Sequence, residues 1–352
     1  MNEKKQKVRM TNKKFLAIWT PVLAIVMAIM LIANVLIQYY SFTIKQVLGY
    51  GEMTVTKAEG SEDWDSDYNT ADYDTAEEAL AAAMDVTEEI AGEGITLLEN
   101  KDNALPLKAS DGDKIKVTLL GNSSVNPVYS GTGSGSASDE NMTSLVDALN
   151  NNGFEVNQAT IDLYNSDKVT SPTYDKTVKN VGMMGEEESG PFQKYARNTS
   201  GLYAENSPWI IGEVPVTDEF YTTDIESTYQ DYSDAAIVTF SRVSGEGADM
   251  PHDMGKFSDW GGEEGKHYLE LDSTEKALLQ YASDNFDTVI VIINSSNAME
   301  LGELSDGTYE NVKGVLWTGG FGSTGTIALA KILKGEINPS GHLADIYASD
   351  FT

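Results

Sequence analysis

The chain has 352 residues, 41% of them hydrophobic, which is enough to bury the core of one large domain or two ordinary ones. Its 24 basic residues are outnumbered by 55 acidic ones, and a net charge of −31 repels phosphate backbones and argues against nucleic-acid binding. There is no cysteine, which excludes disulfides and thiolate metal sites, and the three histidines are scattered, so we expect neither a metal nor a cofactor.

The N-terminus combines a basic start with a long apolar run. Six of residues 1–14 are Lys or Arg, and residues 15–40 carry no charge. A helix of that length would reach about 39 Å, enough to cross a hydrocarbon core of about 30 Å. A cleaved signal peptide is the alternative, but its apolar core should be shorter and end at a small-residue site. We therefore expect a single-pass anchor in the cell membrane, with residues 1–14 cytoplasmic and the remainder extracellular.

Residues 41–83 are expected to form a stalk and an acidic linker. Their middle part is rich in Asp, Glu, Gly and Ser, which is typical of loosely ordered chain. From about Thr75 the residues favour a helix, with Gly92 and Gly94 near a natural stop. Residues 84–352 are then the folded domain.

Within that domain, apolar runs typical of strands alternate with amphipathic runs typical of helices. The expected strands are 115–121, 154–160, 235–240, 287–296 and 312–320, and the expected helices are 143–153, 271–286 and 323–335. Asp272 and Glu275 have the spacing of a capping box, and residues 165–230 are interpreted as insertions and loops. This alternation predicts an α/β fold, a mainly parallel sheet with helices on both faces, and it places function at the carboxyl ends of the strands.

Two glycine-containing stretches carry weak signals. The run "VYSGTGSGSAS" at 128–138 matches neither the dinucleotide fingerprint nor the phosphate loop, so a nucleotide-binding domain is disfavoured and a flexible loop near a ligand edge is preferred. The run "FSDWGG" at 257–262 could present Asp259 beside an aromatic ring, as carbohydrate sites do. No strand precedes it, and it is interpreted as a surface loop.

The run "SRVSGEGADM" at 241–250 follows an expected strand and carries the strongest chemical signal. Gly245 and Gly247 flank Glu246, which allows the backbone to present that carboxyl into a cleft. Asp249 supplies a second carboxylate three residues later, and general acid catalysis needs a protonated carboxyl beside an ionised group. The competing interpretation is a solvated turn in an acidic protein.

Four blocks of the sequence, in order, resemble glycoside hydrolase family 3. They are "AGEGITLLENKDNALPL" (91–107), "SRVSGEGADM" (241–250), "DTVIVIINSSNAMELGEL" (287–304) and "ALAKILKGEINPSGHLADIY" (328–347). They are similar to the second domain of that family, the α/β sandwich that packs against a TIM-like barrel in β-glucosidases. The resemblance covers about residues 84–350.

The resemblance implies retaining hydrolysis of terminal β-glycosidic bonds, without a metal or a nucleotide. An Asp on the barrel is the nucleophile of the family, and a Glu of the sandwich is the acid/base. Glu246 takes that role here, and Asp249 and Arg242 are implied as substrate-binding residues. Retention requires the two carboxyls to lie about 5–5.5 Å apart, so the domains must meet at the sugar. The implied partners are a β-glucoside or oligosaccharide and a family 3 barrel, in cis or in trans.

Several features depart from the family pattern. An anchor stands where a barrel precedes the sandwich in many members, and the chain suits the front half of a permuted enzyme. Ser258-Asp259-Trp260 repeats the letters of the nucleophile motif, but in the sandwich and not on a barrel strand, so we reject it. Met250 stands where many relatives carry Arg. We expect the chain alone to be inactive, and a non-catalytic cell-surface module that binds glycans or a partner is the alternative.

Overall fold

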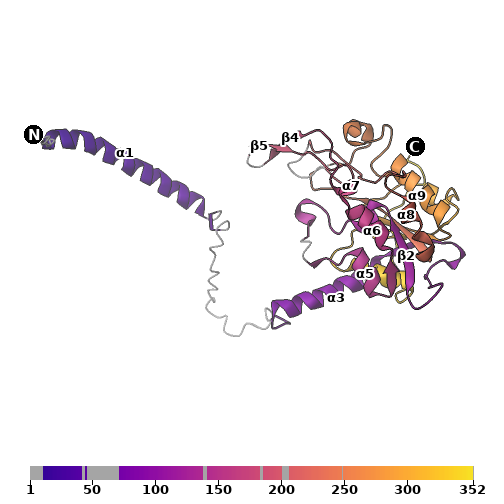
Figure 1. Cartoon of the computed structure of the whole chain (residues 1–352). Coiled ribbons are helices and arrows are strands. Elements are labelled where there is room, and N and C mark those ends of the chain that lie inside the picture. Colours follow the sequence, from indigo (N-terminus) through magenta and orange to yellow (C-terminus); the bar gives the residue numbers. More distant parts are fainter. Residues whose placement is uncertain are drawn as a thin grey trace, which may run out of the picture. The chain divides into compact units, whose positions relative to one another are not determined.

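The computed structural model describes residues 11–41, 44–45, 71–137, 141–182, 185–199, 206–247 and 249–351. The chain divides into two compact units, Met1–Ala71 and Asp72–Thr352, each of which is described by itself (Figure 1). Most of the expected basic tail, residues 1–10, lies outside the described residues, as do residues 46–70 of the expected stalk.

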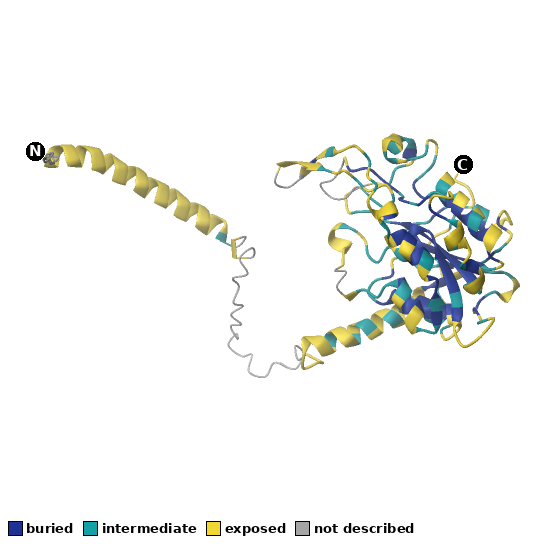
Figure 2. Ribbon diagram, in the orientation of Figure 1, coloured by how far each residue is buried: buried dark blue, intermediate teal, exposed yellow. Residues whose placement is uncertain are grey.

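The described part of the first unit is dominated by one apolar helix. Helix α1 spans Asn12–Tyr39, and none of its residues is buried within the protein (Figure 2). Pro21 lies inside this helix without ending it. By length and composition α1 is able to cross a membrane, a test that an N-terminal signal sequence also passes.

The second unit begins with helix α3, Ala76–Gly94, where a helix was predicted. The side chain of Thr75 caps it by accepting a hydrogen bond from the Glu78 amide, 3.2 Å away. The helix packs on α11, where the hydroxyls of Thr87 and Thr324 are 2.7 Å apart. Residue 84, the boundary expected from the sequence, therefore falls inside an element of this unit.

A six-stranded sheet forms the centre of the second unit, with strand order β1-β8-β7-β6-β2-β3. The strands are β1 (Thr96–Asn100), β2 (Ile115–Leu120), β3 (Phe154–Val156), β6 (Ala235–Arg242), β7 (Val289–Ser295) and β8 (Val312–Trp317). All neighbours pair in parallel except β1, which runs antiparallel to β8 at one edge. The mainly parallel α/β fold is thus confirmed, and the antiparallel edge strand is an addition to it.

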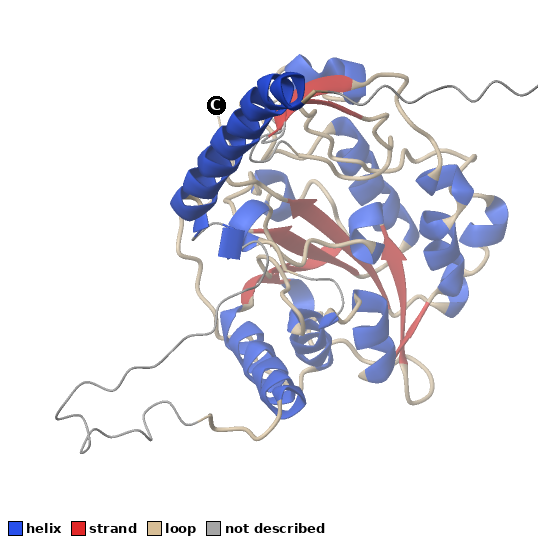
Figure 3. Cartoon of the chain, turned by 90° about the vertical axis from the view of Figure 1, so that its left-hand side faces the viewer, coloured by secondary structure: helices blue, strands red, loops and turns tan. Residues whose placement is uncertain are grey.

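Helices cover both faces of this sheet, and each face has its own apolar core (Figure 3). Every residue of β7 is buried, with Val289, Val291 and Ile293 in one cluster and Ile290 and Ile292 in the other. The continuous apolar run of this strand is explained by that double burial. The helices of the two faces are α9 (Ser273–Asn285) on the first, and α5 (Leu145–Asn151) and α11 (Gly325–Lys334) on the second.

The order of the strands creates a crevice between β2 and β6. After β2 the chain forms β3 on one side of it, and only later forms β6 on the other side. The connections from β2 and β6 run to opposite faces, because α5 follows β2 and α9 follows β6. Such a switch point is where open α/β sheets bind ligands, beyond the carboxyl ends of the strands.

Two local predictions differ from the structure. The strand expected at 154–160 ends at Val156, because the Asn157 side chain accepts a hydrogen bond from the Ala159 amide and starts helix α6, Gln158–Asn165. The region taken as loops also holds regular structure. It contains an antiparallel pair, β4 (Val178–Gly182) with β5 (Gly185–Ser189), and short helices α7 (Asp167–Thr170) and α8 (Thr223–Glu226).

Candidate functional site

Strand β6 ends at Arg242, whose side chain turns into the protein. It is 1% exposed, and its guanidinium donates to both carboxylate oxygens of Glu275, at 2.7 and 2.6 Å. The same group also donates to the backbone oxygens of Tyr268 and Glu270. Burial alone would lower the pKa of Arg242, but the Glu275 carboxylate raises it above its ordinary value. Arg242, which was expected to bind substrate, is therefore a buried residue that fixes the end of β6, where the next loop begins.

Glu246 is exposed on that loop, four residues beyond the end of β6. Its Oε2 accepts hydrogen bonds from the Ser134 hydroxyl at 2.6 Å and the Ser134 amide at 3.0 Å. These two bonds lower the pKa of the Glu246 carboxyl below its ordinary value. In this arrangement Glu246 is ionised at neutral pH, and a general acid would need the opposite shift.

The glycine-rich stretch after β2 builds the seat for Glu246. Gly133, in the short 3-10 helix η3 (Gly133–Gly135), has φ +66°, and a Cβ added there would lie 2.8 Å from the Glu246 Cβ. Only glycine allows both this backbone and this approach. Thr132 adds a hydrogen bond from its hydroxyl to the Ser244 backbone oxygen, 3.2 Å away. The glycine-rich loop, which was expected near a ligand edge, is thus hydrogen-bonded to the loop that follows β6, so the segments after β2 and β6 contact each other at the crevice.

Asp249, the second expected carboxylate, is exposed. Among the described residues its side chain makes no hydrogen bond, and Ala248, which precedes it, lies outside the description. Asp249 is thus available to an incoming group, and nothing within the described domain fixes its direction.

Asn294, on the carboxyl end of β7, ties the neighbouring loops together. Its Oδ1 accepts from the Val128 amide and the Ser241 hydroxyl, each at 2.6 Å, and its Nδ2 donates to the backbone oxygens of Val128 and Gly319. Asn294 is fully buried, so its role is to hold the edge of the crevice and not to meet a ligand.

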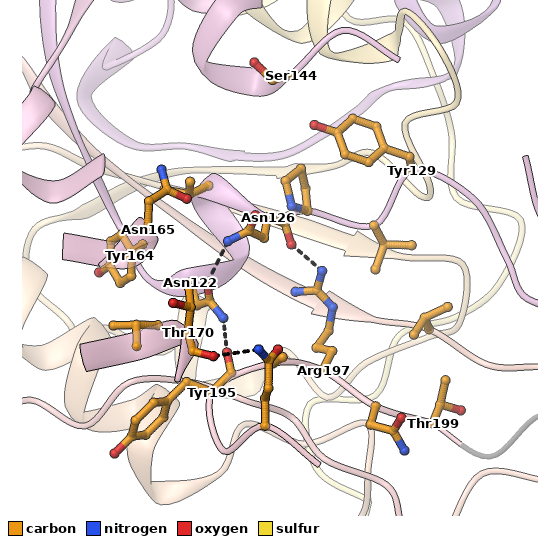
Figure 4. A pocket seen from close by; sticks show the side chains of 18 of the residues that line it. Asn122, Asn126, Tyr129, Ser144, Tyr164, Asn165, Thr170, Tyr195, Arg197 and Thr199 are labelled. Atoms are coloured by element: carbon orange, nitrogen blue, oxygen red, sulfur yellow. Dashed lines mark hydrogen bonds between the residues drawn. The ribbon is translucent and has the colours of Figure 1, made fainter. Parts of the chain in front are cut away.

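A cavity of about 900 Å³ opens beside the end of β2 (Figure 4). Its walls come from α4 (Asn122–Val125), the segment 126–132, the end of α6 and the segment 193–199, with Val243 from the strand that leads to Glu246. Polar side chains dominate the view in Figure 4, together with three tyrosines: Tyr129, Tyr164 and Tyr195. Polar groups beside aromatic rings suit a polyhydroxylated ligand.

The start of α4 is held by a carboxyl that tends to keep its proton. Glu213 accepts from the backbone amides of Asn122, at 3.0 Å, and Val214, at 2.7 Å. Its carboxyl lies among buried groups, although part of the side chain reaches the surface, and burial raises the pKa of Glu213 to about 8. Tyr164 lies nearby, shares a hydrogen bond of 2.7 Å with Tyr221, and accepts from the Gly121 amide.

The remaining sequence signals lie away from this crevice. Asp259 is on the 3-10 helix η6 (Met254–Trp260), exposed and in an ion pair of 2.5 Å with Lys176, which agrees with its interpretation as a surface residue. Within the described ranges, no three His, Asp or Glu side chains are gathered as metal ligands would be.

Sequence reasoning missed Ser134, which lowers the pKa of Glu246, Glu213, whose own pKa is raised, and Arg197, which lines the cavity. Ser134 lies in a stretch that was noticed only for its glycines. Glu213 and Arg197 fall in the region interpreted as loops, where no periodicity distinguished one polar residue from another. Their importance comes from contacts between distant segments.

Comparison with known proteins gives one consistent result. The sequence profile described as "Glycosyl hydrolase family 3 C-terminal domain" matches residues 95–350. The chain is 30% identical to a β-glucosidase of Ruminococcus albus over 75% of the chain and 23% of that protein. It is 29% identical to β-glucosidase A of Butyrivibrio fibrisolvens over 74% of the chain and 28% of that protein.

The fold is similar to the crystal structure of a β-glucosidase from Paenibacillus barengoltzii. The TM-score is 0.56 at 25% identity, over 76% of this chain and 24% of that one. The chain thus spans about a quarter of the length of the relatives it matches.

Proposed function

This chain belongs to glycoside hydrolase family 3, and from that premise we propose that it is the sandwich domain of a retaining β-glucosidase in which Glu246 is the acid/base. The observation that carries the proposal is the exposed Glu246 carboxyl at the β2–β6 crevice, held by Ser134 and braced from below by Arg242. The nucleophile is assigned to a barrel domain, in cis or in trans, which is not among the described residues.

Docking of a barrel would supply the raised pKa that a general acid needs and that Glu246 lacks in the described domain. A nucleophilic carboxylate about 5–5.5 Å away would disfavour the ionised form of Glu246, and exclusion of water at the interface acts in the same direction. The pKa of Glu246, which Ser134 lowers, would then rise toward the range of a general acid. Glu246 donates its proton to the leaving oxygen, and as a carboxylate it later activates the water that attacks the glycosyl-enzyme.

The two other expected residues receive different roles. Asp249, exposed and without a hydrogen-bond partner among the described residues, is assigned to orient a sugar hydroxyl at the interface. Arg242 was expected to bind substrate, but its buried contacts support a positioning role, in which it fixes the end of β6 from which the Glu246 loop begins.

The test compares leaving groups in a protein that joins this chain to a family 3 barrel. Glu246→Gln should lose most activity on glycosides with poor leaving groups, which need the proton, and much less of the first step on activated aryl glycosides. Asp249→Asn should lower activity on both classes to a similar extent. Equal losses on both classes for Glu246→Gln would contradict the acid/base assignment.

A non-catalytic module that binds glycans is the second candidate, and the large polar cavity beside β2 favours it. The chain without a barrel is expected to hydrolyse aryl β-glucosides negligibly, because a lone general acid contributes only about 10²–10⁴-fold. Glycan binding with no turnover after a barrel is supplied would favour the module.

We also propose that α1 remains in the mature protein as a single-pass anchor in the cell membrane, with the sandwich outside. Its length and apolar surface support this, as does the basic sequence before it. Protease added to intact cells should digest the sandwich and leave a short membrane-bound fragment. A mature protein that begins beyond Tyr40 would contradict the proposal.

A further inference from the structure

Among the described residues that line the cavity beside β2, Arg197 is the one cation, and its contacts leave its charge without a counterion. Its Nη1 donates to the Ser123 hydroxyl at 2.7 Å, and its Nη2 donates to the backbone oxygen of Asn126 (Figure 4). Both acceptors are neutral. Among the residues that the structure describes, no carboxylate lies within ion-pair distance of this guanidinium.

The acidic groups that favour the charged form of Arg197 are weak or engaged elsewhere at neutral pH. Burial raises the pKa of Tyr268, and it raises the pKa of Glu213 to about 8, so both mostly keep their protons at pH 7, while Glu275 is paired with Arg242. Burial lowers the pKa of Arg197, as expected for a cation that is partly removed from water without a partner. A partly buried charge that lacks a counterion is unfavourable, and an anion brought by a ligand would relieve that cost.

The two arginines of the folded domain differ in whether they have a carboxylate partner. Arg242 is fully buried and has a bidentate carboxylate partner in Glu275. Arg197 lies on the wall of an open cavity and has none among the described residues. The chain has a net charge of −31, so acidic residues are abundant. A cation in a cavity that has no carboxylate partner is unusual against that background.

The cavity wall combines polar and apolar side chains, and it includes sequence neighbours of the Glu246 seat and loop. Its volume of about 900 Å³ lies within the range of small-molecule sites, and Asn165, Thr170 and Gln193 add donors and acceptors to its wall. Thr132 and Val243 also line the cavity. Thr132 directly precedes Gly133, which contacts Glu246, and Val243 lies at the start of the loop that carries Glu246. A saccharide that reaches Glu246 could therefore extend into the cavity.

We propose that this cavity is a subsite for a sugar residue that carries a carboxylate, a uronic acid, and that Arg197 binds the carboxylate. The saccharide nature of the ligand rests on the proposed function, whereas the carboxylate follows from the contacts of Arg197. The acidic body opposes the approach of an anion over long distances, but at physiological salt that repulsion is screened beyond about 8 Å. Arg197 then decides the interaction at close range.

The experiment measures binding to the full chain in detergent micelles, without a barrel, by ligand-observed saturation-transfer NMR. The probes are D-glucuronate, D-glucose and inorganic sulfate. We expect glucuronate to bind about tenfold more tightly than glucose, the gain of one charge-assisted pair. Sulfate should compete only weakly, since it lacks the ring that the polar wall contacts.

Variants connect the preference to Arg197. Arg197→Gln should remove the difference between glucuronate and glucose, and Arg197→Lys should keep part of it. Asn126→Asp adds a negative charge to the residue whose backbone oxygen accepts from Arg197, and should weaken the preference for glucuronate, so it decides the matter if Arg197→Gln does not fold. Lys334→Gln is the matched control, because it removes one positive charge from an exposed ion pair with Glu336, outside the cavity lining, and should change nothing.

The proposal is overturned if glucuronate and glucose bind equally, if neither binds, or if Arg197→Gln and Asn126→Asp keep the preference. Sulfate that competes as well as glucuronate would indicate a general anion site and would overturn the uronic-acid assignment. Failure here is separable from failure of the acid/base assignment, because hydrolysis by a barrel-joined Glu246→Gln protein depends on Glu246 and not on glucuronate binding by the chain alone.

Discussion

Replacing Glu275 by Gln should destabilise the sandwich domain and loosen the loop that carries Glu246. The side chains of Arg242 and Glu275 are 0% and 3% exposed, and the carboxylate receives two bonds from the guanidinium, at 2.7 and 2.6 Å. The same carboxylate completes the capping box of α9 by accepting from the Asp272 amide at 3.0 Å. The substitution therefore removes a buried counterion and also weakens a helix cap.

The size of the effect follows from these contacts. Removing one partner of a buried pair costs about 3–5 kcal/mol, because the other charge stays buried without compensation. The amide oxygen of Gln keeps one acceptor, so we expect a loss near the lower end, about 3 kcal/mol. For a domain of this size that corresponds to a fall in melting temperature of roughly 5 °C.

The assay is thermal unfolding followed by near-ultraviolet circular dichroism. Glu336→Gln is the control, since it makes the same chemical change in a pair with Lys334 whose side chains are 38% and 47% exposed, and such pairs contribute at most about 1 kcal/mol. If Glu275→Gln costs less than about 1 kcal/mol, comparable to this control, the buried pair does not brace the end of β6.

Three further changes test the environment of the site. Glu213 holds its proton to about pH 8 in the folded state and loses it near 4.5 when unfolded, so stability should fall as pH rises through this range. Glu213→Gln should flatten that dependence in melting curves taken from pH 5 to 8. Ser134→Ala should raise the pKa of Glu246, measured by carbon NMR of its carboxyl with Glu246→Gln for assignment. Tyr164→Phe leaves the Gly121 amide without its acceptor and should cost about 1–3 kcal/mol in unfolding free energy, measured by denaturant titration.

The sheet was predictable because its strands are strongly patterned. The continuous apolar run of β7 implied burial on both faces, and its residues do alternate between the two cores. The capping box of Asp272 and Glu275 was read from local spacing alone, and the structure has both of its hydrogen bonds. Patterns of this kind depend only on residues close together in the sequence, so one sequence is enough to predict them.

Other parts of the fold depend on tertiary contacts. Strand β1 is short and runs antiparallel at the edge of a parallel sheet, which its sequence does not distinguish from a parallel strand. Helix α6 starts where a strand was still expected, because the Asn157 cap ends β3 and begins a helix at Gln158. In the β4–β5 pair, Val181 is exposed and Asn180 is buried, so the sequence of β4 gave no signal of alternating burial.

In the site, too, some features could be predicted from the local sequence and others depend on tertiary contacts. Glu246 was singled out from the glycines around it, and the structure places it at the crevice. Its partner Ser134 is 112 positions away, and no local pattern could have paired the two. The family resemblance implied that Arg242 binds substrate, but its side chain pairs with Glu275 of α9 inside the protein.

Chemical rescue of Glu246→Gln in a barrel-joined protein tests the acid/base assignment most directly. With an activated aryl β-glucoside, the variant should accumulate a glycosyl-enzyme, because no base remains to activate water. Azide needs no base, so it should restore turnover and give the β-glycosyl azide, with retained configuration by NMR. Wild-type behaviour of Glu246→Gln, together with azide rescue of Asp249→Asn, would show that the catalytic carboxylate is Asp249 and not Glu246.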